Sequence, residues 1–351
     1  MSIFQSNLEV SLFGESHGRY IGITIANLPS NIELDIGKIK ADLHKRTAFK
    51  IAKSKRNEAD EFEIISGVFN NKTTGAPLTF LINNRDVDSS VYEKNKGIAR
   101  PSHSDYSAHI KYKGANDYRG GGHLSGRLTA LLIILGSICE SELIKQDIQV
   151  ASRIKSIYDI DDTSEVVDFN NLKSNFPVND PDIKVEMINF LKELENDSVG
   201  GVVETYVKGV KAGIGKPIFA KAESHISRLI FSIPGIKGIE FGAGFNLAKL
   251  LGSQANDQMK YVDGKVKFLS NNSGGIQGGI TNGENIVFRT VVKPTPSINI
   301  PLQTIDYLNK KNIILSTKGR HDASFVPKVV HVINAVTAFA IYDLILGEYN
   351  G

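Results

Sequence analysis

The stretch SGRLTALLIILGSICESELIK, residues 125–145, decides how this 351-residue chain folds. It follows a run of three glycines, and its apolar residues occur on all sides of a helix rather than along one stripe. Residues 327–346 have the same character and open with a proline, which the first turn of a helix tolerates. Helices that are apolar almost all round lie inside a protein. The sequence therefore predicts two helices buried in the core.

Strand-like patterns occur on both sides of the first helix. They cover residues 22–26, 62–69, 78–82, 202–207 and 286–292. Residues 152–198 are acidic and polar and are typical of a peripheral insertion, in which we expect no chemistry. Glycine-rich pieces at 14–18, 119–126, 242–252 and 274–283 lie before and after it, which favours one composite site. We therefore expect a single domain over residues 1–351 with an insertion around 152–198.

The composition argues against several classes of protein. The 41 basic and 38 acidic residues are too balanced for general nucleic-acid binding. No membrane span is expected, because the apolar run at 130–135 is far too short to cross a bilayer. The N-terminus has no secretory pattern and Cys139 is the only cysteine, so we expect a cytoplasmic protein without disulfides. The basic stretch at residues 44–56 is either a solvated loop or a lid over an anionic ligand.

GESHG, residues 14–18, fits the G-x-S-x-G pattern of a serine hydrolase. Only 13 residues precede Gly14, too few to build the sheet on which such a serine stands. His17 is the better candidate, as an acid or base with a pKa near neutrality. The alternative is a turn that carries a surface histidine.

The stretch from Arg100 to Ala130 is dense in side chains that can do chemistry. Around its glycine run it carries His103, His109, Arg119, His123 and Arg127. A helix that starts there, with Ser125 as its cap, offers backbone N–H groups suited to a phosphate. The alternative is that the glycines only form a tight turn. Metal binding is unattractive, because His103, His109 and Asp105 do not complete a recognisable ligand set.

Two later segments complete the candidates. KPTPS, residues 293–297, follows a strand-like run and offers the Lys293 ammonium and two hydroxyls to a phosphate or carboxylate. KGRHD, residues 318–322, places Arg320, His321 and Asp322 just before the C-terminal helix. The alternative for this triplet is an Asp–Arg pair that only caps or braces the helix.

The order of these motifs is that of a known family. GESHG, SGVF with TTGAPL, RPSHSDY, DYRGGGHLSGR, GGIQGGI, KPTPS and KGRHD together resemble the chorismate synthase family, from about Phe13 to the C-terminal helix. The resemblance implies an α+β fold with helices sandwiched between antiparallel sheets, assembled as a homotetramer. It also implies the shikimate-pathway reaction, in which 5-enolpyruvylshikimate 3-phosphate loses phosphate and a ring proton to give chorismate. The cofactor would be reduced FMN, with NADPH only an indirect source through an external reductant.

The resemblance also assigns residues. It implies that His17 and His103 are the catalytic histidines, one assisting phosphate departure and the other keeping the flavin protonated. Ser16 and Asp322 would relay a proton at flavin N5, and Arg46 would lie near the substrate phosphate. The implied FMN contacts are His123, Leu124, Ser125, Pro234, Gly235, Gly278, Lys293, Pro294, Thr295, Pro296, Ser297 and Arg320.

The sequence departs from the family pattern at three places. TAFKIAK, residues 47–53, replaces the usual arginine-rich turn, so a second arginine has no clear counterpart and Lys50 or Lys53 is a possible substitute. His123 stands where many relatives have arginine, and Ala323-Ser324 follows RHD. The rival hypotheses are a flavin-dependent reductase and an RNA-binding or anion-binding protein that uses residues 44–56.

Overall fold

The chain forms two antiparallel sheets with helices between them. The computed structural model describes residues 2–49, 60–85, 88–316 and 322–349. The first sheet has the order β1-β2-β3-β7-β4, with β1 (Ile3–Gln5), β2 (Glu9–Gly14), β3 (Tyr20–Ala26), β7 (Leu78–Asn83) and β4 (Phe62–Ser66). The second has the order β11-β16-β10-β8-β9, with β11 (Ile236–Phe241), β16 (Ile286–Val292), β10 (Gly201–Lys208), β8 (Gln149–Ile157) and β9 (Ile160–Asp161).

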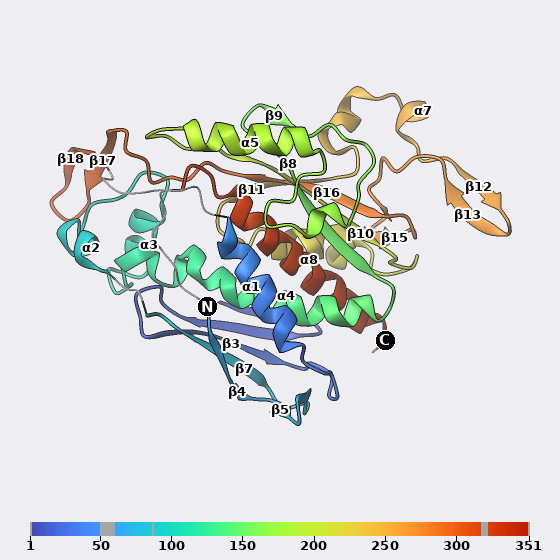
Figure 1. Ribbon diagram of the computed structural model, residues 1–351, viewed down its shortest axis with the longest axis horizontal. Coiled ribbons are helices and arrows are strands. Elements are labelled where there is room, and N and C mark those ends of the chain that lie inside the picture. The colour runs from blue at the N-terminus through green and yellow to red at the C-terminus, as the bar shows by residue number, and fades with distance from the viewer. Residues whose placement is uncertain (1, 50–59, 86–87, 317–321, 350–351) are drawn as a thin grey trace.

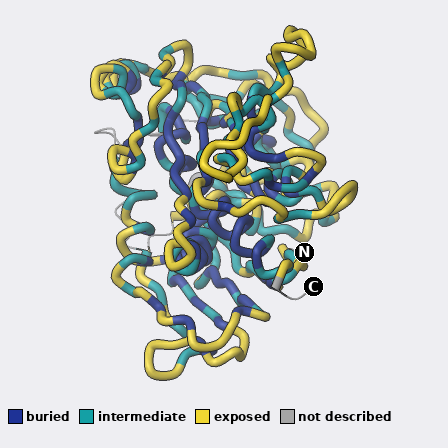
Figure 2. The backbone as a smooth tube through the Cα atoms, turned by 90° about the vertical axis from the view of Figure 1, so that its right-hand side faces the viewer, coloured by how far each residue is buried: buried dark blue, intermediate teal, exposed yellow. Residues whose placement is uncertain are grey.

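Three helices fill the space between the sheets (Figure 1). They are α1 (Ile36–Ala48), α4 (Thr129–Ile144) and α8 (Val326–Tyr349). The helices α4 and α8 pack closely because Gly136 has no side chain, and a Cβ there would overlap the backbone and side chain of Ala335. One apolar cluster joins residues of both sheets and all three helices. Figure 2 shows the buried residues gathered in the middle of the molecule and the exposed ones on its outer loops.

This architecture confirms the predicted α+β sandwich and its two buried helices. Among the described residues, one helix, Val326–Glu348, is long and apolar enough to cross a membrane, with a mean hydropathy of 1.9. However, 78% of its most apolar window is buried inside the protein, as expected for a core helix. All five predicted strand regions are strands. The second of them is broken at Gly67, where φ is +86° and a Cβ would overlap Leu78.

The remaining helices and strands lie outside the two large sheets and the three central helices. The short hairpins are β5 (Val68–Phe69) with β6 (Lys72–Thr73), β12 (Met259–Val262) with β13 (Lys265–Phe268), β14 (Ile276–Gln277) with β15 (Ile280–Thr281), and β17 (Leu302–Asp306) with β18 (Lys311–Leu315). The other α-helices are α2 (Ser90–Lys94), α3 (Asp105–Lys111), α5 (Pro181–Glu193), α6 (Ala222–Ile230) and α7 (Gly252–Ala255). The 3-10 turns are η1 (Arg119–Leu124), η2 (Gly126–Leu128), η3 (Asn171–Lys173), η4 (Ile218–Ala220) and η5 (Gly244–Lys249).

Two predicted boundaries are wrong. The insertion expected from residue 152 begins inside β8, whose second half is paired with β10 and buried on both faces. The polar residues that suggested a peripheral segment there, such as Arg153, are buried in hydrogen bonds and ion pairs. The core helix expected from Ser125 begins at Thr129, after the separate turn η2.

Candidate active site

GESHG forms the turn between β2 and β3. Gly14 ends β2 with φ +93°, and a Cβ there would overlap the backbone of Tyr20. Because β2 and β3 are antiparallel neighbours, the turn is not the strand-to-helix elbow that a nucleophilic serine needs. Instead, the Ser16 hydroxyl donates to the Gly120 carbonyl at 3.1 Å, and the Ser16 N–H donates to Gly122 O at 3.1 Å. The glycine run therefore lies against GESHG.

The glycine run is tightly fitted to His17. Gly120, Gly121 and Gly122 all have positive φ, at 58°, 87° and 55°. A Cβ at Gly120 would overlap the His17 ring, so this position excludes any larger residue. The predicted cap is corrected here. The hydroxyl of Ser125 accepts from Arg127 N at 3.3 Å and caps η2, so it does not cap the long helix α4.

The side chain of His17 is held by residues of the next segment. Its Nδ1 lies 2.9 Å from the Ser89 hydroxyl, and its ring meets the Tyr92 ring edge-on, with centroids 5.0 Å apart. The Arg100 guanidinium lies over the same Tyr92 ring, 5.4 Å from its centroid. Tyr92 thus brings the GESHG turn to the RPSHSDY segment.

An ion pair braces the loop that carries His103. Arg100 donates to both carboxylate oxygens of Asp105, at 2.8 Å each. Burial by itself would raise the pKa of Asp105, but the hydrogen bonds and charge of Arg100 hold that pKa below its usual range. The two residues of this ion pair, Arg100 and Asp105, therefore fix the loop before and after His103.

The KPTPS segment lies against His103. His103 Nε2 is 2.8 Å from the Ser297 hydroxyl, and Lys293 donates to the Ser102 carbonyl at 2.7 Å. Partial burial and the nearby charge of Lys237 lower the pKa of Lys293. Thr295 is buried, and its hydroxyl has no hydrogen-bond partner among the residues that the structure describes. That buried hydroxyl fits a polar ligand beside this segment, as a flavin would be.

The remaining predicted cofactor residues fall into two groups. Lys293 N–H donates to the Gly235 carbonyl at 2.9 Å, so Pro234 and Gly235 lie at the same end as KPTPS. His123 Nε2 is 3.0 Å from the Tyr112 hydroxyl, and Leu124 next to it is 41% exposed. Gly278 is different, because it lies in the β14–β15 hairpin, at the other end of the molecule from α2 and α3 (Figure 1).

The KGRHD motif is described only in part. Arg320 lies outside the described residues. Asp322 accepts from Lys328 Nζ of α8 at 2.5 Å, and the Asp–Arg pair that the sequence left as an alternative stays a prediction. Lys50 and Lys53 also lie outside the described residues. Of the basic stretch at residues 44–56, the structure therefore describes only residues 44–49, at the C-terminal end of α1.

Two functional candidates, Asp60 and Asn84, were missed by the sequence, and a third, Arg127, was named without a role. Arg46 donates to Asp60 at 3.1 Å, and Arg127 pairs with the other oxygen of the same carboxylate. Arg127 also donates from Nε to the Asn84 carbonyl oxygen at 3.1 Å. Arg127 and Arg46 thus share one carboxylate. The only signal for Arg127 was its place after the glycine run, and nothing in the sequence marked Asp60 or Asn84.

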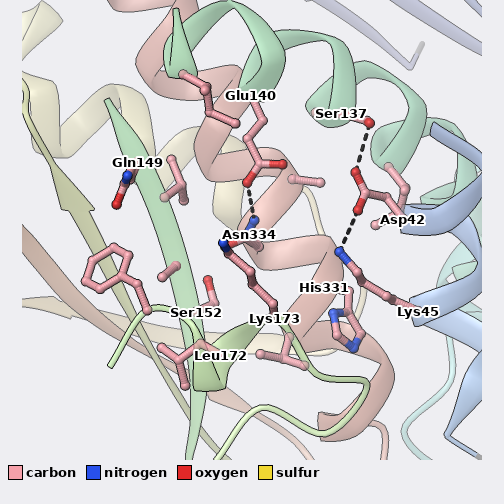
Figure 3. Close-up of a pocket in the computed structure, with 18 of the residues that line it drawn as sticks. Asp42, Lys45, Ser137, Glu140, Gln149, Ser152, Leu172, Lys173, His331 and Asn334 are labelled. Atoms are coloured by element: carbon pink, nitrogen blue, oxygen red, sulfur yellow. Dashed lines mark hydrogen bonds and ion pairs between the residues drawn. The ribbon is translucent and has the colours of Figure 1, made fainter. Parts of the chain in front are cut away.

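A cleft in the described part of the chain lies away from this site. It has a volume of about 290 Å³ and lies between α1, α4, α8 and β8, where none of the described candidate residues lines it (Figure 3). Its carboxylates are already paired: Asp42 with Lys45 and Ser137, each at 2.8 Å, and Glu140 with Asn334 at 3.3 Å (Figure 3). Within the described ranges no group of His, Cys, Asp or Glu could hold a metal ion.

An α+β sandwich that gathers two histidines, two arginines and a hydroxyl-rich loop at one end defines an enzyme acting on an anionic small molecule. The family model described as chorismate synthase matches residues 8–346. The chorismate synthase of Thermococcus kodakarensis is 42% identical over 97% of this chain and 96% of its own length. The chorismate synthase of Archaeoglobus fulgidus is 40% identical over 99% of this chain and 97% of its own length.

A solved structure agrees with these relatives. It is titled "Crystal Structure of Chorismate Synthase", has a TM-score of 0.77 at 28% identity, and covers 98% of this chain and 93% of its own. The chain belongs to the chorismate synthase family. It is a carbon–oxygen lyase of the shikimate pathway, which converts 5-enolpyruvylshikimate 3-phosphate to chorismate and phosphate.

Proposed function

We propose that the reaction takes place where GESHG, RPSHSDY and KPTPS meet, with reduced FMN beside KPTPS. The observation that carries this proposal is that His17 and His103 lie on loops joined through Tyr92 and Arg100. Each histidine is oriented by a serine hydroxyl, Ser89 for His17 and Ser297 for His103. Two histidines so held are positioned to exchange protons with bound ligands.

The two histidines have different neighbours, which favours different roles. His17 is tied through Asn84 to Arg127 and Arg46, so we assign His17 to the departing phosphate that the arginines bind. His103 lies on KPTPS and is assigned to the flavin. When bound beside KPTPS, reduced FMN would supply electron density and a proton acceptor for the elimination. The chain's own side chains bind the phosphate, protonate it and exclude water.

The cofactor contacts are proposed from KPTPS outward. Lys293 and the buried Thr295 hydroxyl suit polar groups of a flavin, and the turn of Pro234 and Gly235 is bonded to Lys293 N–H. His123, Leu124 and Ser125 follow the glycine run that lies against GESHG. Ser16 and Asp322 are proposed to relay the proton. Their present partners are Gly120 O and Lys328. Arg320 and Gly278 complete the set by resemblance alone.

The assembly is proposed to be a homotetramer in the cytoplasm. The β12–β13 hairpin projects from the body (Figure 1) and exposes Met259, Tyr261 and Val266, which are 61%, 79% and 50% exposed. An isolated two-stranded hairpin is marginally stable by itself, which supports an interface with another copy there. Reduced FMN would come from an external reductant, with NADPH only its indirect source.

One anaerobic assay tests the proposal. With 5-enolpyruvylshikimate 3-phosphate and reduced FMN, we expect phosphate release over many turnovers without net flavin oxidation. Absence of phosphate release with reduced flavin present would contradict the proposal. A flavin-dependent reductase would instead oxidise NADPH steadily with a substrate acceptor. An RNA-binding protein would show an affinity that falls steeply with salt and does not depend on His17 or His103.

A further inference from the structure

A buried chain of hydrogen bonds joins four separate segments behind the candidate site. Its centre is Asp60, whose side chain is 1% exposed. One oxygen of Asp60 accepts from Arg46 at 3.1 Å, and the other accepts from Arg127. The Arg46 and Arg127 side chains are 14% and 12% exposed. We call these three residues with Asn84 the site cluster.

The shared carboxylate has a clear electrostatic effect. Two guanidinium groups repel each other when they are held close together in a partly buried place. A carboxylate that bonds both groups removes this repulsion and fixes their relative orientation. Arg46 is further held by Thr129, whose hydroxyl accepts from Arg46 Nε at 3.2 Å. Asp60 therefore determines where both guanidinium groups point.

Asn84 joins the arginines to the GESHG turn. Its side-chain oxygen accepts from Arg127 Nε at 3.1 Å. Its amide nitrogen donates to the carbonyls of Glu15 and Gly18, at 3.1 and 2.9 Å, which flank Ser16 and His17. Only an amide can accept from a guanidinium on one side and donate to two carbonyls on the other. The residue is 9% exposed, so water replaces these bonds poorly.

We propose that Asp60 and Asn84 are positioning residues for the elimination. Asp60 orients Arg46 and Arg127 as one binding unit for the substrate phosphate, and Asn84 holds that unit at a constant distance from His17. The inference rests on the proposed function, in which the arginines bind the phosphate and His17 acts on it. It predicts that the two residues affect different kinetic constants.

Substitution of each residue tests the inference in the full-length enzyme with reduced FMN. Asp60→Asn should raise KM for 5-enolpyruvylshikimate 3-phosphate at least about tenfold and lower kcat less, because ground-state binding is lost. Asn84→Asp keeps the acceptor but cannot donate to the two carbonyls. It should lower kcat at least about tenfold with a smaller change in KM, because His17 is misplaced. Glu240→Gln, which changes an arginine-paired carboxylate on the second sheet, is the matched control and should change neither constant more than about twofold.

The outcomes separate the inference from the function. If the wild type releases no phosphate, the proposed function fails, whatever the variants do. If the wild type is active and Asp60→Asn keeps its KM, or if both variants lose activity only in proportion to lost folded protein, the inference is wrong. Should Asp60→Asn not fold, Asp60→Glu carries the test, because it keeps the charge but moves it by one methylene. It must also raise KM, and an unchanged KM would overturn the proposal.

Discussion

Two arginine–carboxylate clusters among the described residues of this sandwich differ in the backbone that carries them. In the site cluster the four residues come from the end of α1, a segment before β4, the turn η2 and the residue after β7. The second cluster, which we call the sheet cluster, lies on paired strands except for Asp162, which directly follows β9. It consists of Arg153, Asp162, Glu204, Arg289 and Glu240, with Glu204 directly opposite both Arg153 and Arg289, and Arg289 opposite Glu240.

The sheet cluster is fixed by strand register. Arg153 bonds Glu204 at 2.7 Å, and Arg289 bonds Glu240 at 2.7 Å. Burial alone would raise the pKa of Glu204, but Tyr206, Arg153 and Arg289 hold it below its usual range. Cross-strand pairs of this kind stabilise a sheet. The comparison teaches that the same ionic chemistry stabilises the fold when strands carry it, and can serve a ligand when element ends carry it.

The largest expected effect is at the histidine tied to the site cluster. His17→Ala should lower kcat about 10²- to 10⁴-fold, because a positioned proton donor is lost. His103→Ala should do the same. The control is His109→Ala, in the helix α3 that follows the loop of His103, which we expect to stay within about twofold. Thermal melting should remain cooperative in all three variants. Loss of that transition in His17→Ala would mean that the histidine is structural.

Breaking the sheet cluster should lower the stability of the protein and leave its turnover unchanged. Arg153→Leu removes the arginine that Glu204 and Asp162 share, and their side chains are 7% and 0% exposed. Glu204 keeps Arg289 and Tyr206, but among the described residues Asp162 then has only hydrogen bonds from backbone N–H groups to offset its charge. We expect a loss of about 3–5 kcal/mol in the free energy of unfolding. Denaturant titration measures this loss, and kcat per folded molecule should not change. Unchanged stability would remove the distinction between the two clusters.

A pH experiment separates acid effects on stability from those on turnover. Burial lowers the pKa of His331 to about 4, with a smaller opposing contribution from its bond to the Asn175 carbonyl. Lys45 also lowers this pKa, and Asp42 raises it. The unfolded chain binds the proton near pH 6.5, so stability should fall as pH drops from about 6.5 to 4, by up to about 3 kcal/mol. His331→Gln should flatten this part of the stability curve, and an equally steep curve would contradict the assignment.

The smallest expected effect is at the exposed edge of the sheet cluster. The Glu240 side chain is 27% exposed. Glu240→Gln should therefore cost about 1 kcal/mol or less, well below Arg153→Leu. Denaturant titration of the two variants measures the free energy of unfolding that each one loses. If both variants lost the same free energy of unfolding, the contribution of each ion pair in the sheet cluster would not depend on its burial.

Much of the fold could be predicted from the sequence, because apolar patterns report burial directly. The helices α4 and α8 and strands such as β16 follow from such patterns. The second half of β8 could not be predicted as core, because its buried Arg153 looks like a surface residue until its partner Glu204 on β10 is known. The late start of α4 depends on three consecutive positive φ values, which three glycines permit but do not dictate.

Residues of the candidate site could be predicted only where they belong to a recognisable sequence motif. His17 and His103 stand in recognisable motifs, and the structure brings their loops together through Tyr92. The site cluster could not be found in this way. Arg46, Asp60, Asn84 and Arg127 are spread over more than eighty positions, and their contacts depend on how α1, β7 and η2 meet. Spacing along the chain carries no information about such contacts.

The most direct measurement is the dissociation constant of 5-enolpyruvylshikimate 3-phosphate in the wild type, Arg127→Leu and Arg289→Leu. Calorimetric titration with oxidised FMN measures it without turnover. We expect Arg127→Leu to weaken binding at least about tenfold, and Arg289→Leu, from the sheet cluster, to leave it within about twofold. Equal affinities for the two variants would contradict the claim that only the site cluster binds the substrate phosphate.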